Sequence, residues 1–194
     1  EEDTLMDTVL ETKDVTKIYR QGGIEVVAVD GVTLTLEAGE VLLIMGPSGS
    51  GKTTLLSMMG CILHPTRGTV RVNSSVVSAM KEDLLPDIRK KYFGFVFQSF
   101  NLFPSLTAVE NVEVILRLKG WSKVDRRTAA VKLLDAVGLK TRAGFYPRDL
   151  SGGEKQRVAF ARALAGDPPI ILADEPTGNL DSKTGNAVLG LLKD

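Results

Sequence analysis

The sequence has little of what would assign it to several common classes of protein. Cys61 is its only cysteine, so no internal disulfide can form. The 24 basic and 24 acidic residues cancel, so no global positive field argues for a nucleic-acid partner. No apolar run approaches the roughly 18 residues of a membrane span, and the N-terminus does not resemble a signal peptide. We therefore expect a soluble chain in a reducing cytoplasm, with no nucleic acid among its partners.

The sequence does contain enough apolar residues for a folded domain. They make up 43% of its 194 residues, which allows one domain with a buried core. Residues 9–19 and 25–36 alternate in part between β-branched and polar residues, on either side of Gln21-Gly22-Gly23. This pattern predicts two antiparallel strands joined by a turn.

A glycine-rich segment follows a continuous apolar run. Val41 to Met45 is apolar throughout, which predicts a parallel strand covered by helices on both faces. Gly46 to Thr53 then has two glycines with four residues between them, followed by Lys-Thr, which matches the phosphate-loop pattern. A helical pattern continues over residues 54–59, so an ordinary glycine-rich turn is the less favoured alternative.

The residue types of this segment suit the binding of a triphosphate. Glycines have no Cβ atoms, so backbone N–H groups can curl around a phosphate, and the helix expected from about Gly51 adds its positive end. Lys52 can then reach the β- and γ-phosphates, and the Thr53 hydroxyl is placed to ligate Mg²⁺. The expected nucleotide-binding residues of the loop are Gly46, Ser48, Gly49, Ser50, Gly51, Lys52, Thr53 and Thr54.

A second apolar run ends in two carboxylates. Residues 170–173 predict another buried strand, and Asp174-Glu175-Pro176 follows it. Successive strand residues point to opposite sides, so we expect Asp174 to bind Mg²⁺ through water and Glu175 to orient and deprotonate an attacking water. An acidic turn closed by proline would be the preferred interpretation if this run stood alone, and the phosphate loop reverses that preference.

A third segment opens a helix with two glycines. Leu150 to Arg157 leads into the helical pattern of residues 158–164, and Ser151 with Glu154 fits a capping box. Gly152 and Gly153 would also expose N–H groups that can take an anion. Local evidence leaves capping and anion binding about equally favoured.

In this order, the segments resemble the nucleotide-binding subunits of ABC transporters, over nearly the whole chain from Val9. The resemblance implies an α/β fold: the P-loop NTPase core of an ABC ATPase, with an N-terminal antiparallel β subdomain and an α-helical subdomain. It implies a single nucleotide-binding domain over residues 1–194, with an ATP-binding core at 8–97 and 151–194. Residues 98–150 would form the helical subdomain, with the signature at its end. The matched motifs are Tyr19 (adenine stacking), 46–53 (Walker A), Gln98 (Q-loop), 150–154 (signature), 170–175 (Walker B) and Asp181 (D-loop).

The resemblance also implies roles for these residues. It implies ATP and Mg²⁺ as cofactors, with Glu175, Lys52, Gln98 and Asp181 catalytic and with Thr53, Gln98 and Asp174 at the metal. ATP would lie between the Walker motifs of one copy and Ser151, Gly152 and Gly153 of a second copy, in a head-to-tail dimer. An integral-membrane permease would be the other partner, at the inner face of the plasma membrane. By themselves, a strand-end tyrosine and a loop glutamine are usually structural, so Tyr19 and Gln98 depend on this context.

A finer similarity is to the lipoprotein-release and macrolide-export branch. It rests on Gly60-Cys61, His64-Pro65-Thr66, residues 95–102 and residues 174–181. In the helical subdomain we expect a capping box at Thr107 to Glu110 and a helix over residues 123–137, with Gly138 as its C-cap. Phe100, Leu102 and Phe103 would suit a groove that docks the permease, although core packing is equally open for each.

Two departures from the family pattern stand out. Glu154 replaces the glutamine of many relatives, which keeps the capping role and adds a charge near the phosphate site. The family's switch histidine belongs on a strand beyond the D-loop, whereas the only histidine here is His64, expected at the surface without a catalytic role. The sequence ends in a helix-like segment, residues 186–193, so we expect a longer parent protein, and activity could be lost without that strand.

Other function classes are weighed by the same residues. A DNA-maintenance ABC ATPase would carry a long heptad insertion before the signature, and this interval has none. A GTPase would need an Asn-Lys-x-Asp element to read guanine, and the sequence has none. An ATP-driven mechanical or regulatory subunit that moves no substrate stays open as an alternative.

Overall fold

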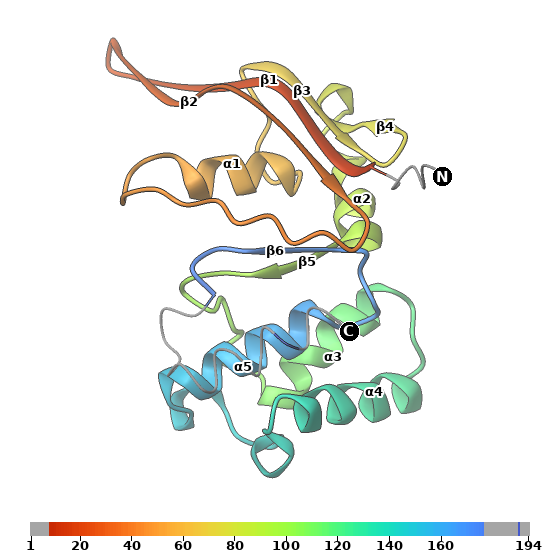
Figure 1. The fold of residues 1–194 in the computed structure, drawn as a ribbon. Coiled ribbons are helices and arrows are strands. Elements are labelled where there is room, and N and C mark those ends of the chain that lie inside the picture. Colours follow the sequence, from red (N-terminus) through yellow and green to blue (C-terminus); the bar gives the residue numbers. More distant parts are fainter. Residues whose placement is uncertain (1–7, 177–189, 191–194) are drawn as a thin grey trace, which may run out of the picture. The chain divides into compact units, whose positions relative to one another are not determined.

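The computed structural model describes residues 8–176 and residue 190 of the chain (Figure 1). The chain divides into two compact units, residues 1–89 and residues 90–194, which are described in turn. Asp181 and the helix-like segment 186–193, apart from residue 190, lie outside the described residues.

The first unit contains an antiparallel sheet of four strands in the order β2-β1-β3-β4 (Figure 1). β1 pairs with β2 from Thr8↔Glu37 to Gln21↔Ile24, with register shifts along the way. Gly22 and Gly23 connect them with φ of 58° and 82°, the backbone that a two-residue hairpin turn requires. The predicted hairpin is therefore confirmed. The strand bounds are β1 Thr8–Gln21, β2 Ile24–Glu37, β3 Arg67–Val72 and β4 Ser75–Val76.

Helix α1, Lys52–Met59, lies against β1 and β2 and starts where the phosphate loop ends. Its buried face consists of Leu55, Met58 and Met59. Burying an aliphatic side chain of this size stabilises a fold by about 1.5–3 kcal/mol, so these residues anchor the loop to the sheet. The unit also contains the short 3₁₀ helix η1, Val77–Ala79, and most of α2, Leu85–Tyr92.

The predicted parallel strand at Val41 to Met45 is wrong in this structure. These residues form neither strand nor helix, and Leu43 and Met45 are 74% and 81% exposed. A strand needs a neighbour for its backbone N–H and C=O groups, and in the described part of the chain no strand pairs with this run. Instead, residues 42–47 line an open hollow together with β2 and the start of α1.

The second unit has a two-stranded parallel sheet of β5, Phe93–Val96, and β6, Ile170–Ala173. The predicted buried strand at residues 170–173 is thus confirmed. Helix α5, Gly152–Ala163, packs on β5 so closely that a Cβ on Gly94 would meet the carbonyl oxygen of Ala163 at 2.1 Å. Helices α3, Ala108–Leu118, and α4, Lys123–Ala136, pack against α5 and against each other (Figure 1). Two 3₁₀ helices, η2 Lys140–Arg142 and η3 Pro147–Asp149, lie between α4 and α5.

The helices of the second unit begin at well-formed caps. Both predicted capping boxes are present, at the start of α3 with Glu110 and at the start of α5 with Glu154. The C-cap of α4 is Val137, one residue earlier than predicted, and Gly138 follows it with φ of 71°. The amide of Asn111, fully buried, donates to the carbonyl oxygens of residues 103, 106 and 107 and so fixes the loop before α3.

The three apolar residues expected at a groove or in the core divide between the two. Leu102 packs against the hydrophobic core of this unit, and Phe100 is half-buried. Phe103 is 48% exposed, so it alone of the three offers a large apolar surface.

Candidate active site

The phosphate loop leads into a helix start that no side chain caps. Gly51 is the N-cap of α1 and has no side chain to accept a hydrogen bond, and no acidic residue stands in the first turn of the helix. The first N–H groups of a helix have no intrahelical acceptor, and the helix dipole makes this end positive. An anion is therefore the ligand that this helix start is built to accept.

Two glycines of the loop adopt a backbone that other residues rarely adopt. Gly49 has φ of 80° and Gly51 has φ of 88°. A Cβ on Gly51 would also meet the carbonyl oxygen of Ala28 at 2.0 Å, whereas a Cβ on Gly49 would meet nothing within 4 Å. Gly51 thus joins the loop to β2, and Gly49 only lets the loop turn.

Lys52 is held by the loop that it follows. Its Nζ donates to the carbonyl oxygens of Gly46 and Pro47, at 2.8 Å each. An ammonium group has three N–H donors, so the same group can hold the loop and bind an anion together. Gly46, Ser48, Gly49, Ser50 and Thr53 are exposed, and Lys52 and Thr54 are partly buried. The first unit therefore brings the whole predicted loop together at one surface.

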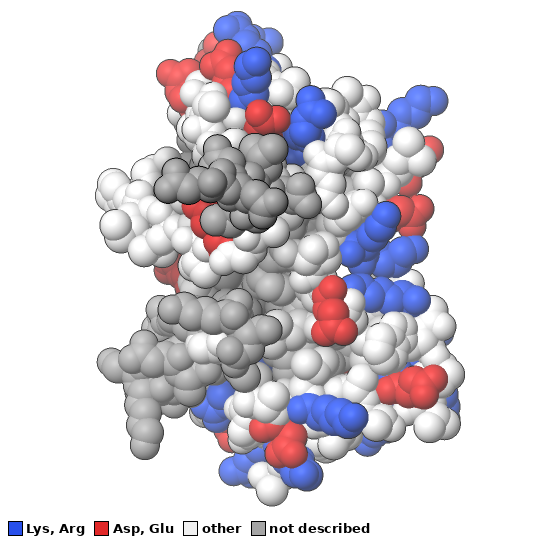
Figure 2. Space-filling view, turned by 45° about the vertical axis from the view of Figure 1, so that its right-hand side comes forward, with Lys and Arg blue, Asp and Glu red and all other residues white. Residues whose placement is uncertain are grey.

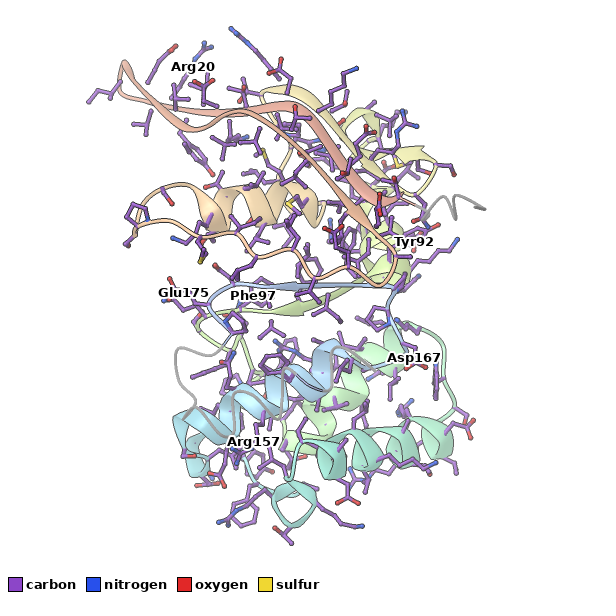
Figure 3. The ribbon with its side chains drawn as sticks, in the orientation of Figure 1. Arg20, Tyr92, Phe97, Arg157, Asp167 and Glu175 are labelled. Atoms are coloured by element: carbon purple, nitrogen blue, oxygen red, sulfur yellow. The ribbon has the colours of Figure 1, made fainter. Side chains whose placement is uncertain are left out.

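Tyr19 lies near the end of β1 with 44% of its surface exposed. It pairs with Val26 of β2, so the two side chains share one face of the hairpin, as does the exposed Ile24. Arg20 and Glu25 on the other face form an ion pair of 2.8 Å (Figure 3). The sequence analysis missed Val26 and Ile24 as neighbours of Tyr19, although the hairpin register would have pointed to them.

Gln98 and Glu175 meet in the second unit because of its parallel sheet. Val96 pairs with Ala173, and the amide of Asp174 donates to the Val96 carbonyl oxygen at 2.9 Å. Gln98 and Glu175 each follow their strand by two residues, so both lie at the same edge of the sheet, where Figure 3 labels Glu175 and Phe97. The Nε2 of Gln98 donates to Oε2 of Glu175 at 2.6 Å.

Glu175 has an uncommon backbone conformation. Its φ is 46°, in the left-handed region that favours glycine. Non-glycine residues in that region cost of order 1–3 kcal/mol and cluster at functional sites. The carbonyl oxygen of Pro176, the next residue, accepts from Nε2 of Gln156 at 2.9 Å. The turn that carries the carboxylate is therefore held by a side chain of α5.

The start of α5 both caps itself and leaves amides available. The Ser151 hydroxyl accepts from the Glu154 amide at 3.2 Å, and the Glu154 carboxylate accepts from the Ser151 amide at 2.8 Å. The amides of Gly152 and Gly153 have no intrahelical acceptor. Capping and anion binding are thus compatible here.

The charge of Glu154 is paired by a residue that the sequence analysis did not identify. Nε of Arg142 donates to the Glu154 carboxylate at 3.1 Å, and its guanidinium stacks on Phe145. Hydrogen bonds from Ser151 hold the pKa of Glu154 below its usual value, and the charge of Arg142 adds to this effect. The carboxylate therefore stays ionised, and its charge is offset beside the glycines.

The predicted metal ligands have the right chemistry for Mg²⁺. Mg²⁺ prefers oxygen donors and takes few of them from the protein. A hydroxyl from Thr53, an amide oxygen from Gln98 and one carboxylate from Asp174 are such donors, and the Gln98–Glu175 bond uses the amide nitrogen. Among the described residues no cluster of three or more His, Cys, Asp and Glu side chains could hold a metal.

Two further observations concern the charge of the surface and membrane-spanning helices. Basic and acidic side chains are interspersed on the face drawn in Figure 2, in line with the zero net charge. None of the helices in the described part of the chain is long and apolar enough to cross a membrane.

Comparisons with known proteins place the chain among well-defined relatives. A family model described as ABC transporter matches residues 29–178. An uncharacterized ABC transporter ATP-binding protein of Thermotoga maritima is 50% identical over 188 residues, which cover 97% of this chain and 80% of that protein. The macrolide export ATP-binding/permease protein MacB of Burkholderia thailandensis is 44% identical over 190 residues, which cover 98% of this chain and 29% of MacB.

A solved structure shares both sequence and fold. The ATP-binding cassette MJ0796, in a dimeric post-hydrolysis state bound to ADP and Pi, superposes with a TM-score of 0.91 at 47% identity. The match covers 94% of this chain and 81% of that one.

Proposed function

Because the chain belongs to the ABC transporter family of ATP-binding cassettes, we propose that it powers a membrane transporter of the efflux or lipoprotein-release type. The resemblance, the P-loop NTPase fold and the assignment as an ATPase are confirmed by the family match and the similar cassette structure. The observation that carries the proposal is the phosphate loop, whose glycines and Lys52 surround the uncapped start of α1.

ATP binding is assigned to the loop and to the hairpin. The backbone amides of Gly46 and of residues 48–51 and the Lys52 ammonium bind the phosphates, and the Thr53 and Thr54 hydroxyls lie in the first turn of α1. The exposed Tyr19 ring takes the adenine by stacking, with Val26 beside it. The phosphate loop and the Tyr19 ring are both exposed, which supports this assignment.

Hydrolysis is assigned to the residues at the edge of the parallel sheet. Glu175 accepts a proton from water as the water oxygen attacks the γ-phosphorus, and the bond to the β–γ bridging oxygen breaks. Gln98, hydrogen-bonded to Glu175, orients that carboxylate and the water. Asp181 is proposed as a further catalytic residue. Mg²⁺, held by Thr53, Gln98 and Asp174, would neutralise phosphate charge when bound.

The proposed working unit is a head-to-tail pair of copies. Ser151, Gly152 and Gly153 of one copy bind the γ-phosphate held by the other copy, which places the two amides and the hydroxyl where negative charge develops. Loss of the γ-phosphate removes that bridge, and the pair opens. The dimeric state named for MJ0796 supports this arrangement.

The proposed second partner is an integral-membrane permease. The name of MacB joins an ATP-binding part and a permease, and the match to this chain covers 29% of MacB. We place the chain at the inner face of the plasma membrane, with an ATP-binding core at residues 8–97 and 151–194 and a helical subdomain at 98–150. We assign a contact with the permease to the exposed Phe103 of that subdomain.

The test is ATP-driven dimerisation of a Glu175→Gln variant. Without the proton acceptor the nucleotide stays intact, so the pair should persist in size-exclusion chromatography with MgATP and separate with MgADP. Glu113→Gln, an exchange in the middle of α3, is the matched control and should behave as the unchanged protein does. A Glu175→Gln protein that binds MgATP and yet remains monomeric would overturn the proposed dimer.

A further inference from the structure

Helix α5 reaches both loops that carry the proposed catalytic pair, and it does so through two buried side chains. Arg162 is 7% exposed and Gln156 is 0% exposed. Each donates hydrogen bonds to backbone carbonyl oxygens close to Gln98 or Glu175 in the chain. We infer that Arg162 and Gln156 are positioning residues, which set the geometry of Gln98 and Glu175 for hydrolysis. This inference rests on the proposed function.

Arg162 holds the segment that follows Gln98. Its Nη1 donates to the carbonyl oxygen of Asn101 at 2.5 Å, and its Nη2 donates to that of Phe100 at 2.7 Å. Both residues have left-handed backbones, with φ of 63° at Phe100 and 47° at Asn101. Two adjacent non-glycine residues in that region persist only where the surroundings fix them, and the two prongs of the guanidinium do so.

A structural role alone explains the placement of Arg162 poorly. Burial lowers the pKa of Arg162, because apolar surroundings disfavour the charged form. Among the described residues no carboxylate forms an ion pair with Arg162, and its hydrogen-bond acceptors there are two backbone carbonyl oxygens. An aliphatic side chain would fill the same space more favourably.

Gln156 gives the second, independent observation. Its Nε2 donates to the carbonyl oxygen of Pro176, directly after Glu175, while its Oε1 is buried and has no hydrogen-bond partner among the described residues. Burying an acceptor without a partner disfavours the folded state, whereas methionine has a similar volume and no such acceptor, so we expect Gln156→Met to keep the stability of the fold. The side-chain amide of Gln156 therefore serves to hold the strained turn at Glu175.

The two contacts act on one catalytic geometry. Gln98 and Glu175 lie 2.6 Å apart in their own hydrogen bond, on loops that leave adjacent strands. Since α5 packs on β5, its side chains fix both loops relative to the sheet. A shift of about 1 Å at either loop can lower the rate of a positioned reaction by up to about a hundredfold.

The experiment compares Gln156→Met and Arg162→Lys with the unchanged protein. Both variants should lower kcat for ATP hydrolysis by roughly tenfold or more while the KM for ATP stays within about twofold, because the phosphate loop is untouched. Gln156→Met should unfold at the same temperature as the unchanged protein or higher. Backbone hydrogen exchange should accelerate at residues 98–101 in Arg162→Lys and at Asp174 and Glu175 in Gln156→Met.

Arg127→Lys is the matched control, because Arg127 also donates through Nη1 to an acceptor in the second unit, the carboxylate of Glu113, but on the exposed faces of α4 and α3. It should change neither kcat nor exchange. A kcat within about twofold of the unchanged protein in a folded Gln156→Met variant would overturn the inference, as would equal losses in Arg127→Lys. If the unchanged protein neither binds nor hydrolyses ATP, the proposed function fails. The exchange measurements need no nucleotide, and unaltered exchange in both variants would then overturn the holding role separately.

Discussion

The two units present their candidate site residues by different means. In the first unit the phosphate loop offers backbone amides, and its path depends on Gly51 and on the bonds from Lys52 to the loop carbonyls. In the second unit Gln98 and Glu175 are side chains, and buried residues of α5 hold their loops. The difference teaches that nucleotide affinity should follow the backbone path of one unit, whereas the rate of hydrolysis should follow the hydrogen-bond network of the other.

The largest expected effect is that of Gly51→Ala, which tests how far affinity depends on backbone path. The new Cβ would meet the Ala28 carbonyl oxygen at 2.0 Å and would force φ away from 88°. We expect MgATP binding to be lost and the free energy of unfolding to fall by more than about 2 kcal/mol, measured by titration and by denaturant unfolding.

Gly49→Ala is the control for this change, since its Cβ meets nothing within 4 Å at a φ of 80°. It should lower the free energy of unfolding by only about 1–2 kcal/mol, the strain of one left-handed residue. Equal losses in the two variants would mean that the contact with β2 does not govern the loop.

A second change acts on the first unit through a side chain. Tyr19→Ala removes the exposed ring and should weaken MgATP affinity by about tenfold, since stacking of a base on an aromatic ring contributes about 1–3 kcal/mol. Tyr19→Phe keeps the ring and should bind as the unchanged protein does. The kcat at saturating ATP should be the same in the unchanged protein and in both variants. A fall in kcat without a change in affinity would contradict the assignment of Tyr19 to nucleotide binding.

A third change tests the caps that position the helices of the second unit. Hydrogen bonds from Thr107 lower the pKa of Glu110, and the bond from the Thr107 hydroxyl has a larger effect than the bond from the Thr107 backbone amide. A folded pKa below the unfolded value stabilises the protein at higher pH, and this contribution is lost as the pH falls from 4.5 through the folded pKa. Thr107→Ala should lower the free energy of unfolding by about 1 kcal/mol at pH 7 and by less in acid.

Thr128→Ala is the control for that cap, because Thr128 lies inside α4 and its hydroxyl only donates to the Val124 carbonyl oxygen. Its unfolding free energy should change by less than about 0.5 kcal/mol at either pH. A loss in Thr107→Ala that is the same at pH 7 and pH 3 would contradict the assignment of the ionised Glu110 to this cap.

The smallest expected effect concerns the charge beside the signature glycines. Arg142→Ala leaves the Glu154 carboxylate without its cation, so the ATP-bridged dimer should weaken by roughly two- to fivefold in a Glu175→Gln background. Adding Glu154→Gln should restore the affinity, which sedimentation at graded ATP concentrations would measure. If the double variant stays as weak as Arg142→Ala, the effect of Arg142 lies in packing on Phe145 rather than in charge.

Local signals predicted the parts of this structure that local chemistry decides. The hairpin at Gly22 and Gly23 and the two capping boxes depend on residues no more than three apart, and all are present. The strand prediction at Val41 to Met45 was wrong because an apolar composition indicates that a segment suits burial and does not indicate that a partner strand lies beside it.

The network around the catalytic pair could not be predicted in the same way. The contact between Gln98 and Glu175 comes from the register of β5 and β6, which are far apart in sequence. Arg162 and Gln156 gave one weak signal, polar residues along a helix otherwise buried, and their acceptors are backbone carbonyls that no side-chain motif marks.

The central claim is that the loop from Gly46 to Thr53 binds the phosphates of ATP, and Lys52→Ala tests it most directly. A charge-assisted hydrogen bond contributes about 1.5–3 kcal/mol, so equilibrium titration should show MgATP affinity reduced by at least about tenfold. Lys123→Ala, at the exposed start of α4, should leave the affinity unchanged. A folded Lys52→Ala protein that binds MgATP as tightly as the unchanged protein would contradict the account.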